Sequence, residues 1–346
     1  MAITREHFGF AKSGEAVSLF TLTNAQGAAA RVLSYGCVLQ SLSVPAREGL
    51  RDVCLGFDSL EEYESKGGCF GAVCGRYANR IRAGRFSLNG REYFVSLNAG
   101  GRHHIHGGVR GFHKQVWQAE AEGTVLRLRR RSPDGEEGYP GNLDVTVEYE
   151  LDDANALHIR YRVGTDADTV LNLTNHSYFN LNGHGSGPVM DHTLRLAASA
   201  ITAVDESGMP DGTLLPVEGT PFDFRGAKPL GRDIDSGHPQ LLLGRGYDHN
   251  FVLDGRGQRT IGELRAGDGS LTMTVDTDQP GVQLYTANNL SGLEGKGGAV
   301  YGRRSAVCLE TQHYPNSPEH AHFPSTVLRR GEVFTSETIY RFRRED

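Results

Sequence analysis

Two residues with acid/base side chains stand where β-strands ordinarily carry valine or isoleucine. His176 lies in NLTNHSYFNLNG (172–183), and Glu310 interrupts the otherwise apolar run of AVCLETQ (306–312). A buried histidine can simply donate a hydrogen bond to a backbone carbonyl, whereas a buried carboxylate is costly unless it is paired or useful. Histidine titrates near neutral pH, so an imidazole and a carboxylate together could move protons at a substrate.

Six further residues lie in polar segments that are interspersed with aromatic side chains. A ligand covered in hydroxyl groups needs both donors and acceptors, and an aromatic ring can lie against the C–H face of a sugar. Each residue also has a structural explanation, such as a turn cap, an ion pair or an amide at a strand edge. We therefore take the following as candidate binding residues: Asn79, Arg80, His106, Tyr178, Asp248 and Gln283.

A cluster of histidines at positions 103, 104, 106 and 113 raises the question of a metal site. Zinc requires three or four converging ligands, and neither an H-E-x-x-H motif nor a Cys/His pairing accompanies these residues. We expect no metal there. Dinucleotide-binding, phosphate-loop and nucleophile-elbow motifs are not found either, so we expect no cofactor.

The elements that must position these residues are strands, because apolar and polar residues alternate along the chain. The segments 143–151, 157–163 and 271–277 follow this period of two, and RLRRR (127–131) is interpreted as a strand with a solvated face. One short helix is expected near 59–64. Glycine- and proline-rich turns separate the strands, which predicts an all-β fold of packed antiparallel sheets in a single domain, 1–346.

Charge and cysteine content narrow the classes of partner. The net charge of -6 disfavours nucleic-acid binding and binding to an anionic membrane, both of which require a basic surface. No segment is apolar for long enough to predict a membrane span. The five cysteines include no C-x-x-C pair, and the N-terminus lacks the apolar core of a signal peptide. We therefore expect reduced thiols and a cytoplasmic location.

Seven segments together resemble the aldose 1-epimerase (galactose mutarotase) family, in the order and at separations compatible with that family. They are GRYANRI (75–81), HGGVRGF (106–112), SPDGEEGYPG (132–141), NLTNHSYFNL (172–181), YDHNF (247–251), PGVQLYT (280–286) and CLETQHYPNSP (308–318). The resemblance implies a large antiparallel β-sandwich of the galactose mutarotase-like supersandwich type with few short helices. It also implies a cofactor-free isomerase that interconverts the α and β anomers of free aldohexoses such as galactose and glucose.

Carried over to this sequence, the resemblance implies that His176 is the general acid and Glu310 the general base. It implies that the six candidate binding residues hold the sugar. The chain departs from the family pattern at His104 and Ile105, before the two glycines, and in EHAHFPS (319–325). These departures concern the geometry of the loops rather than the catalytic pair.

Three alternatives remain. A hexose-6-phosphate 1-epimerase would need further cationic groups around the phosphate. A glycosidase would need two carboxylates flanking the bond; Asp248 and Glu310 are the available pair, and that role leaves His176 idle. A non-catalytic sugar-binding module could dispense with both members of the acid/base pair. For the main hypothesis we expect a monosaccharide substrate and a monomer or weak homodimer.

Overall fold

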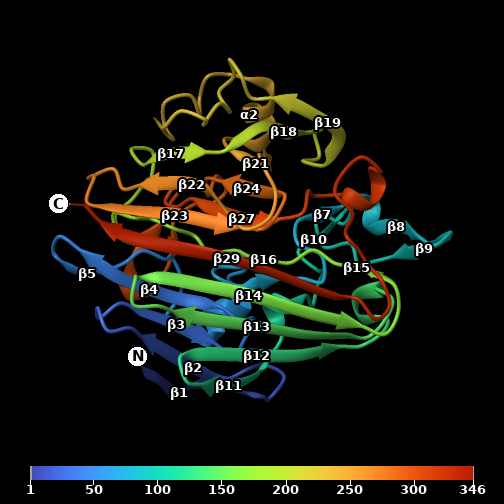
Figure 1. Cartoon of the computed structure of the whole chain (residues 1–346), viewed down its shortest axis with the longest axis horizontal. Helices are drawn as coiled ribbons and strands as arrows, with labels where there is room; N and C mark the ends of the chain where they lie inside the picture. Colours follow the sequence, from blue (N-terminus) through green and yellow to red (C-terminus); the bar gives the residue numbers. More distant parts are fainter. Residues whose placement is uncertain (1, 346) are drawn as a thin grey trace.

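Antiparallel strands dominate the architecture, which is described for residues 2–345 of a computed structural model (Figure 1). The strands form a nine-stranded sheet, two five-stranded sheets and several two-stranded ribbons. Figure 1 shows the nine-stranded sheet running across the molecule, with the N-terminal strands at the lower left and β18 (Ala198–Val204), β19 (Pro210–Pro216) and β21 (Asp248–Leu253) in the upper part. The all-β prediction is confirmed.

The nine-stranded sheet contains every strand that alternation predicted. The predicted strands at 143–151, 157–163 and 271–277 correspond to β13, β14 and β23, and the basic segment lies in β12. In sheet order the strands are β11 (Gln118–Glu122), β12 (Val125–Ser132), β13 (Leu143–Leu151), β14 (Ala156–Thr165), β29 (Val333–Arg344), β23 (Leu271–Thr277), β22 (Arg259–Arg265), β17 (Thr193–Leu196) and β20 (Lys228–Pro229). The outward face of β12 is charged as expected, and Arg127 pairs with Glu148 and Glu122.

In Figure 1 the first of the two five-stranded sheets lies at the lower left, and the second runs from the top to the centre of the molecule. The first is built from β1 (Ala2–Phe10), β2 (Ala16–Thr23), β3 (Ala29–Leu33), β4 (Leu39–Ala46) and β5 (Gly49–Asp52). The second, in sheet order, is built from β19 (Pro210–Pro216), β18 (Ala198–Val204), β21 (Asp248–Leu253), β24 (Gly281–Tyr285) and β27 (Cys308–Gln312). We call this second group the β27 sheet; it carries three of the candidate residues, Asp248, Gln283 and Glu310.

Short ribbons contain or adjoin the remaining candidate residues, of which Arg80 lies within a strand. They pair β6 (Val73–Cys74) with β16 (Thr174–Asn175), β7 (Arg80–Ile81) with β10 (His104–Ile105), β8 (Arg85–Leu88) with β9 (Arg91–Phe94), β15 (Thr169–Val170) with β28 (Val327–Leu328), and β25 (Leu293–Glu294) with β26 (Val300–Tyr301). Two-residue pairings fix the path of the chain at a few hydrogen bonds, so the loops beside them can turn inward.

The helices are short. The predicted helix is α1 (Leu60–Ser65), and Ser59 and Glu62 form a capping box at its N-terminus. A second helix, α2 (Pro239–Gly244), was not predicted; proline at its first position favours a helix start. The 3-10 turns are η1 (Arg82–Gly84), η2 (Phe112–Lys114), η3 (Glu136–Gly138), η4 (Lys296–Gly298) and η5 (Ser317–Glu319).

A continuous apolar core joins the three larger sheets into a sandwich. It contains Phe20 from β2, Val145 and Val147 from β13, and Val282 from β24. Strand β13 contacts β2, and β29 contacts β4. Burying one such side chain contributes about 1.5–3 kcal/mol, so the alternation that predicted the strands also supplies the energy that packs the sheets.

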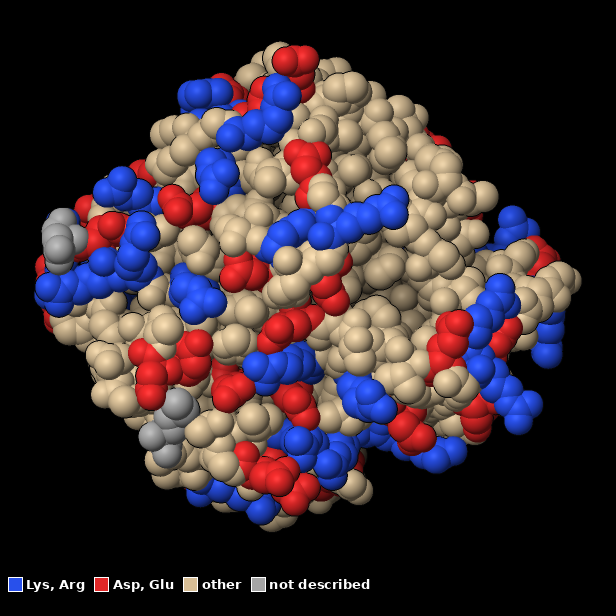
Figure 2. All heavy atoms as spheres, viewed as in Figure 1, with Lys and Arg blue, Asp and Glu red and all other residues tan. Residues whose placement is uncertain are grey.

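Charges of both signs are interspersed on the face drawn in Figure 2, and no large basic patch covers it. Many of the acidic and basic side chains pair with one another, as in the contact between Arg160 and Glu337. Among residues 2–345, no helix is both long enough and apolar enough to cross a membrane.

Candidate active site

One face of the β27 sheet carries a row of polar side chains. Gln283 of β24 lies directly opposite Glu310 of β27, and in β21 both Asp248 and Asn250 belong to the same face. Because side chains alternate along a strand, the intervening residues, such as Leu309, point into the apolar core. Both faces of these strands are therefore buried, which explains why the sequence around Glu310 is apolar except for the residues that face the site.

His176 follows the short strand β16 and is held by its backbone and by its ring. Its N–H donates to the carbonyl of Ala72 at 2.8 Å, and its own carbonyl accepts from the N–H of Gly71 at 2.9 Å. The imidazole stacks on Tyr178, with ring centroids 4.9 Å apart and an angle of 21° between the planes. On the described chain its Nδ1 atom has no hydrogen-bond partner, so backbone contacts and stacking orient this ring.

The structure brings His176 and Glu310 together. The distance from His176 Nε2 to Glu310 Oε1 is 3.6 Å, and the two side chains are 7% and 3% exposed. Burial raises the pKa of Glu310 to about 7; the nearby charge of Asp248 adds to this rise, and His176 opposes it. A carboxyl group with such a pKa can accept and return a proton near neutral pH.

His106 contributes a second imidazole to the site. Its Nδ1 accepts a hydrogen bond from the backbone N–H of Asn79 at 3.2 Å, so the neutral ring carries its proton on Nε2. Burial lowers the pKa of His106 to about 3, which keeps the ring neutral. Potential ligand atoms of His106, His176 and Glu310 lie within 4.8 Å of one another. The three side chains thus converge on one point.

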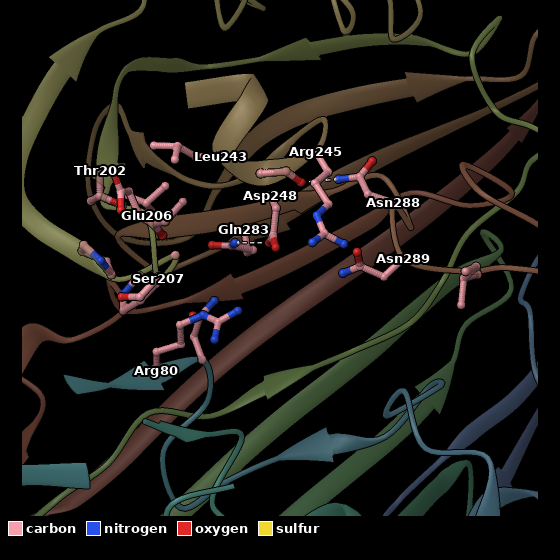
Figure 3. A pocket seen from close by; sticks show the side chains of 18 of the residues that line it. Arg80, Thr202, Glu206, Ser207, Leu243, Arg245, Asp248, Gln283, Asn288 and Asn289 are labelled. Atoms are coloured by element: carbon pink, nitrogen blue, oxygen red, sulfur yellow. Dashed lines mark hydrogen bonds between the residues drawn. The ribbon is translucent and has the colours of Figure 1, made fainter. Parts of the chain in front are cut away.

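Arg80 and Asp248 approach from different elements. Figure 3 shows Arg80 extending from β7 toward the space beside Asp248, which stands at the start of β21. Gln283 Nε2 donates to Asp248 Oδ1 at 2.7 Å. Burial raises the pKa of Asp248, while the Arg80 charge and the Gln283 hydrogen bond lower it. This carboxyl group is therefore held in place and can accept further hydrogen bonds.

A cavity of about 250 Å³ contains the convergence point. Its wall includes seven of the eight candidate residues, namely Asn79, Arg80, His106, His176, Tyr178, Asp248 and Glu310. Gln283 does not line this cavity. Its amide donates a hydrogen bond to Asp248, and its side chain lines a neighbouring cavity. Tyr178 presents its ring, because its hydroxyl donates to the carbonyl of Gly68 at 2.9 Å.

The neighbouring cavity, drawn in Figure 3, is larger, at about 810 Å³. It shares Asn79, Arg80, Asp248 and Asn289 with the first cavity, so the two spaces are adjacent. Arg245, at the end of α2, extends into it, and Arg303 also lines it. The cationic groups here are more numerous than the single arginine of the smaller cavity.

The histidine cluster noted in the sequence does not converge. His104 is fully buried, where its Nδ1 contacts the carbonyl oxygen of Ser96 at 2.7 Å and its Nε2 contacts the hydroxyl of Tyr139 at 2.6 Å. Burial lowers the pKa of His104 to about 4. These contacts give His104 a structural role. His113 faces a different cavity.

Sequence reasoning missed several residues of the smaller cavity, including Cys69, Tyr285 and Asn289. Tyr285 could have been found, because it lies two residues after Gln283 and therefore on the same face of β24. Cys69 sits in an irregular turn with φ of 52°, and no periodicity signals its direction. The five cysteines are all free.

The chain is similar to known proteins over almost its whole length. A model of the aldose 1-epimerase family matches residues 18–341. The galactose mutarotase of Sus scrofa is 43% identical over 347 residues, covering 99% of each chain, and the aldose 1-epimerase of Escherichia coli is 36% identical, covering 96% of this chain and 97% of its own.

Among solved structures, a GalM/aldose epimerase homologue from C. elegans superposes with a TM-score of 0.89 at 29% identity, covering 96% of this chain and 100% of its own. The galactose 1-epimerase of Lactobacillus acidophilus superposes with a TM-score of 0.87 at 30% identity, covering 100% of this chain and 99% of its own. The large antiparallel sandwich of this chain is therefore similar to theirs.

Proposed function

Because this chain belongs to the aldose 1-epimerase family and is an aldose 1-epimerase, we propose that His176 and Glu310 are its acid/base pair. The observation that carries this proposal is the 3.6 Å separation of His176 Nε2 and Glu310 Oε1 inside a cavity of about 250 Å³. The proposed substrates are free aldohexoses, galactose and glucose, whose α and β anomers are interconverted.

The reaction must open a hemiacetal ring and close it from the other face of the carbonyl. Glu310 removes the proton from the C1 hydroxyl while His176 delivers a proton to the ring oxygen. The C1–O5 bond breaks, its electron pair stays on the protonated oxygen, and C1 becomes an aldehyde. After rotation about C1–C2, both proton transfers run in reverse and return each side chain to its starting state.

The distances support this assignment of roles. The hydroxyl oxygen and the ring oxygen are both bonded to C1, so their two catalytic partners must lie close together. Side chains 3.6 Å apart can each approach one of these oxygens at a hydrogen-bonding distance of about 2.6–3.2 Å. The pKa of about 7 for Glu310 matches a base that works near neutral pH.

The remaining residues are proposed to hold the sugar while C1 turns. Arg80 and the Nε2–H of His106 donate hydrogen bonds to hydroxyl groups of the sugar. Asp248 accepts hydrogen bonds from hydroxyl groups of the sugar. Asn79 can do both, and Tyr178 offers an aromatic wall. We assign Gln283 an indirect role, because its amide fixes Asp248.

Free sugars are preferred in this proposal over hexose 6-phosphates because Arg80 is the one arginine in the wall of the smaller cavity. Arg245 and Arg303 border the neighbouring cavity, so a phosphorylated substrate deserves a direct test. Glucose and glucose 6-phosphate should be assayed side by side, with Arg245→Gln as a variant. A higher kcat/KM for the phosphate ester, lost in Arg245→Gln, would favour the phosphate-specific alternative.

The central experiment is polarimetry of freshly dissolved α-D-galactose, with glucose, xylose and arabinose in parallel. We expect His176→Ala and Glu310→Ala to slow mutarotation severely while circular dichroism remains that of a folded protein. A near-normal rate in either folded variant would remove that residue from the mechanism. Hydrolysis of aryl galactosides would support a glycosidase instead, and sugar binding with no acceleration would support a non-catalytic module.

We also propose that residues 1–346 act as a single domain, a monomer or weak homodimer, in the cytoplasm. One core cluster reaches from Phe20 to Phe342, which supports a single folding unit. Five free cysteines are consistent with a reducing compartment. Neither nucleic acid nor membrane is a proposed partner. Analytical ultracentrifugation measures the oligomeric state directly.

A further inference from the structure

The segment CFGAVC, residues 69–74, contacts His176 and holds it in place, and it has a cysteine at each end. Cys74 ends the short strand β6, and Cys69 lies in the turn before it. Of the five cysteines, Cys69 is the one that is not fully buried. The two cysteines are therefore the first and last residues of a segment that contacts the active site.

This segment fixes the position of the imidazole in two ways. Gly71 and Ala72 supply the two backbone hydrogen bonds that hold residue 176. Phe70 stacks on Tyr178, with ring centroids 4.2 Å apart and 19° between the planes, and Tyr178 stacks in turn on His176. A shift of the segment would therefore move the imidazole, because both contacts would move with it.

The two thiols are joined by a hydrogen bond and differ chemically. A hydrogen bond from the Cys74 thiol lowers the pKa of Cys69 below its usual range; burial opposes this lowering, and His113 and His106 add to it. Burial raises the pKa of Cys74. Thiolate character is thus concentrated on Cys69, which is the nucleophilic form of the group.

Reagents can approach Cys69 through two cavities. It lines the cavity that contains His176 and Glu310, and it lines a second cavity of about 200 Å³ on the other side, beside His113 and Lys114. Cys74 lines neither cavity. A small oxidant can therefore react first with Cys69. Cys74, which lines neither cavity, is hydrogen-bonded to it.

We propose that Cys69 is a modification site for hydroperoxides, and that its oxidation ends in a disulfide with Cys74 that displaces His176 and switches off the epimerase. This inference rests on the proposed role of His176. It adds a site whose ligand class is a peroxide rather than a sugar.

The chemistry proceeds in two balanced steps. The Cys69 thiolate attacks one oxygen of the peroxide, the O–O bond breaks, and a sulfenic acid forms while the second oxygen leaves as water or an alcohol after taking up a proton. Cys74 then attacks the Cys69 sulfur, the S–O bond breaks, and water leaves. Two thiols are oxidised to one disulfide, and one peroxide is reduced.

Forming the bond draws Cys69 toward Cys74 and forces the intervening turn to adjust. A misplacement of about 1 Å in a catalytic group can lower the rate on the order of 10²-fold. We expect a loss of that size in kcat/KM for galactose, with recovery when dithiothreitol reduces the bond.

The test treats the full chain with hydrogen peroxide and follows both mass and mutarotation. We expect a peptide in which residues 69 and 74 are crosslinked and have lost two hydrogens, appearing in step with the loss of activity. Cys69→Ser should resist inactivation, measured as the ratio of treated to untreated rate. Cys74→Ser should stop at the sulfenic acid, which dimedone traps at Cys69. Cys37→Ala, which removes a buried cysteine outside the segment, is the matched control and should respond as the wild-type protein does.

Three results would overturn the proposal: no crosslink between Cys69 and Cys74 at peroxide concentrations that inactivate the enzyme, equal inactivation of Cys69→Ser, or a full crosslink with an unchanged rate. The crosslink and the dimedone adduct are measured by mass alone. They would still form if His176 proved to have no role in proton transfer, so failure of the catalytic assignment is distinguishable from failure of the thiol site.

Discussion

Replacing Glu310 with glutamine should inactivate the enzyme and, above neutral pH, stabilise it. The side chain is 3% exposed, and its pKa is raised from 4.5 to about 7, mainly by burial. The folded state therefore keeps its proton up to about pH 7, whereas the unfolded chain releases it near pH 4.5. The free energy of unfolding consequently falls as pH rises between these values and stays lowered above pH 7. Glutamine has nearly the same shape and never ionises.

The size of the effect follows from the shift. At about 1.36 kcal/mol per pKa unit, raising the pKa from 4.5 to about 7 corresponds to about 3 kcal/mol. With an unfolding entropy of about 2.1 cal/mol/K per residue, a chain of 346 residues converts this to about 4 °C in Tm. We expect the advantage of Glu310→Gln over wild type to grow by about that amount from pH 4.5 to pH 8.

Differential scanning calorimetry at several pH values gives the Tm difference, and polarimetry gives the rate. The rate should fall on the order of 10²–10⁴, because one member of the proton-transfer pair is lost. Glu48→Gln, a substitution in the exposed turn between β4 and β5, is the matched control for the change of side chain. A Tm difference for Glu310→Gln that stays constant across this pH range would refute the link between burial and a raised pKa.

Three further predictions concern catalysis. The kcat/KM of the wild-type enzyme should rise with pH through about 7 as Glu310 loses its proton, and a flat profile from pH 5 to 8 would contradict its role as base. Asp248→Asn should move this rise to lower pH, because the Asp248 charge contributes to the raised pKa of Glu310; an unmoved profile would separate the two groups. Arg80→Ala should raise KM for galactose roughly 10- to 100-fold, as expected when a charged hydrogen bond is lost, and unchanged kinetics would exclude Arg80 from binding.

Much of the fold was predictable because strand periodicity is a local property. Alternation between apolar and polar residues identified β13, β14 and β23, and the short helix expected near 59–64 is α1. Strands β21, β24 and β27 were harder to recognise, since they are buried on both faces and lose the alternation. Helix α2 is a single short stretch with little amphipathic pattern, so its local signal was too weak.

The candidate site divides in the same way. The order of the motifs identified seven residues that line the smaller cavity. It also grouped Gln283 with them, although this side chain lines the neighbouring cavity and donates a hydrogen bond to Asp248. Histidines that are adjacent in the sequence were considered as one cluster. In space His104 is buried against Tyr139, while His106 joins His176.

The sequence alone indicated the strand-rich fold, the two side chains proposed as the acid/base pair and the family to which the chain belongs, because these follow from residue type, period and order. Only the tertiary structure decided how far apart His176 and Glu310 lie, which tautomer His106 adopts and how strongly burial perturbs the Glu310 carboxyl group. It also decided that the segment between Cys69 and Cys74 makes the backbone hydrogen bonds that hold His176. These properties depend on distance and on exclusion of water, which are set when segments remote in the chain pack together.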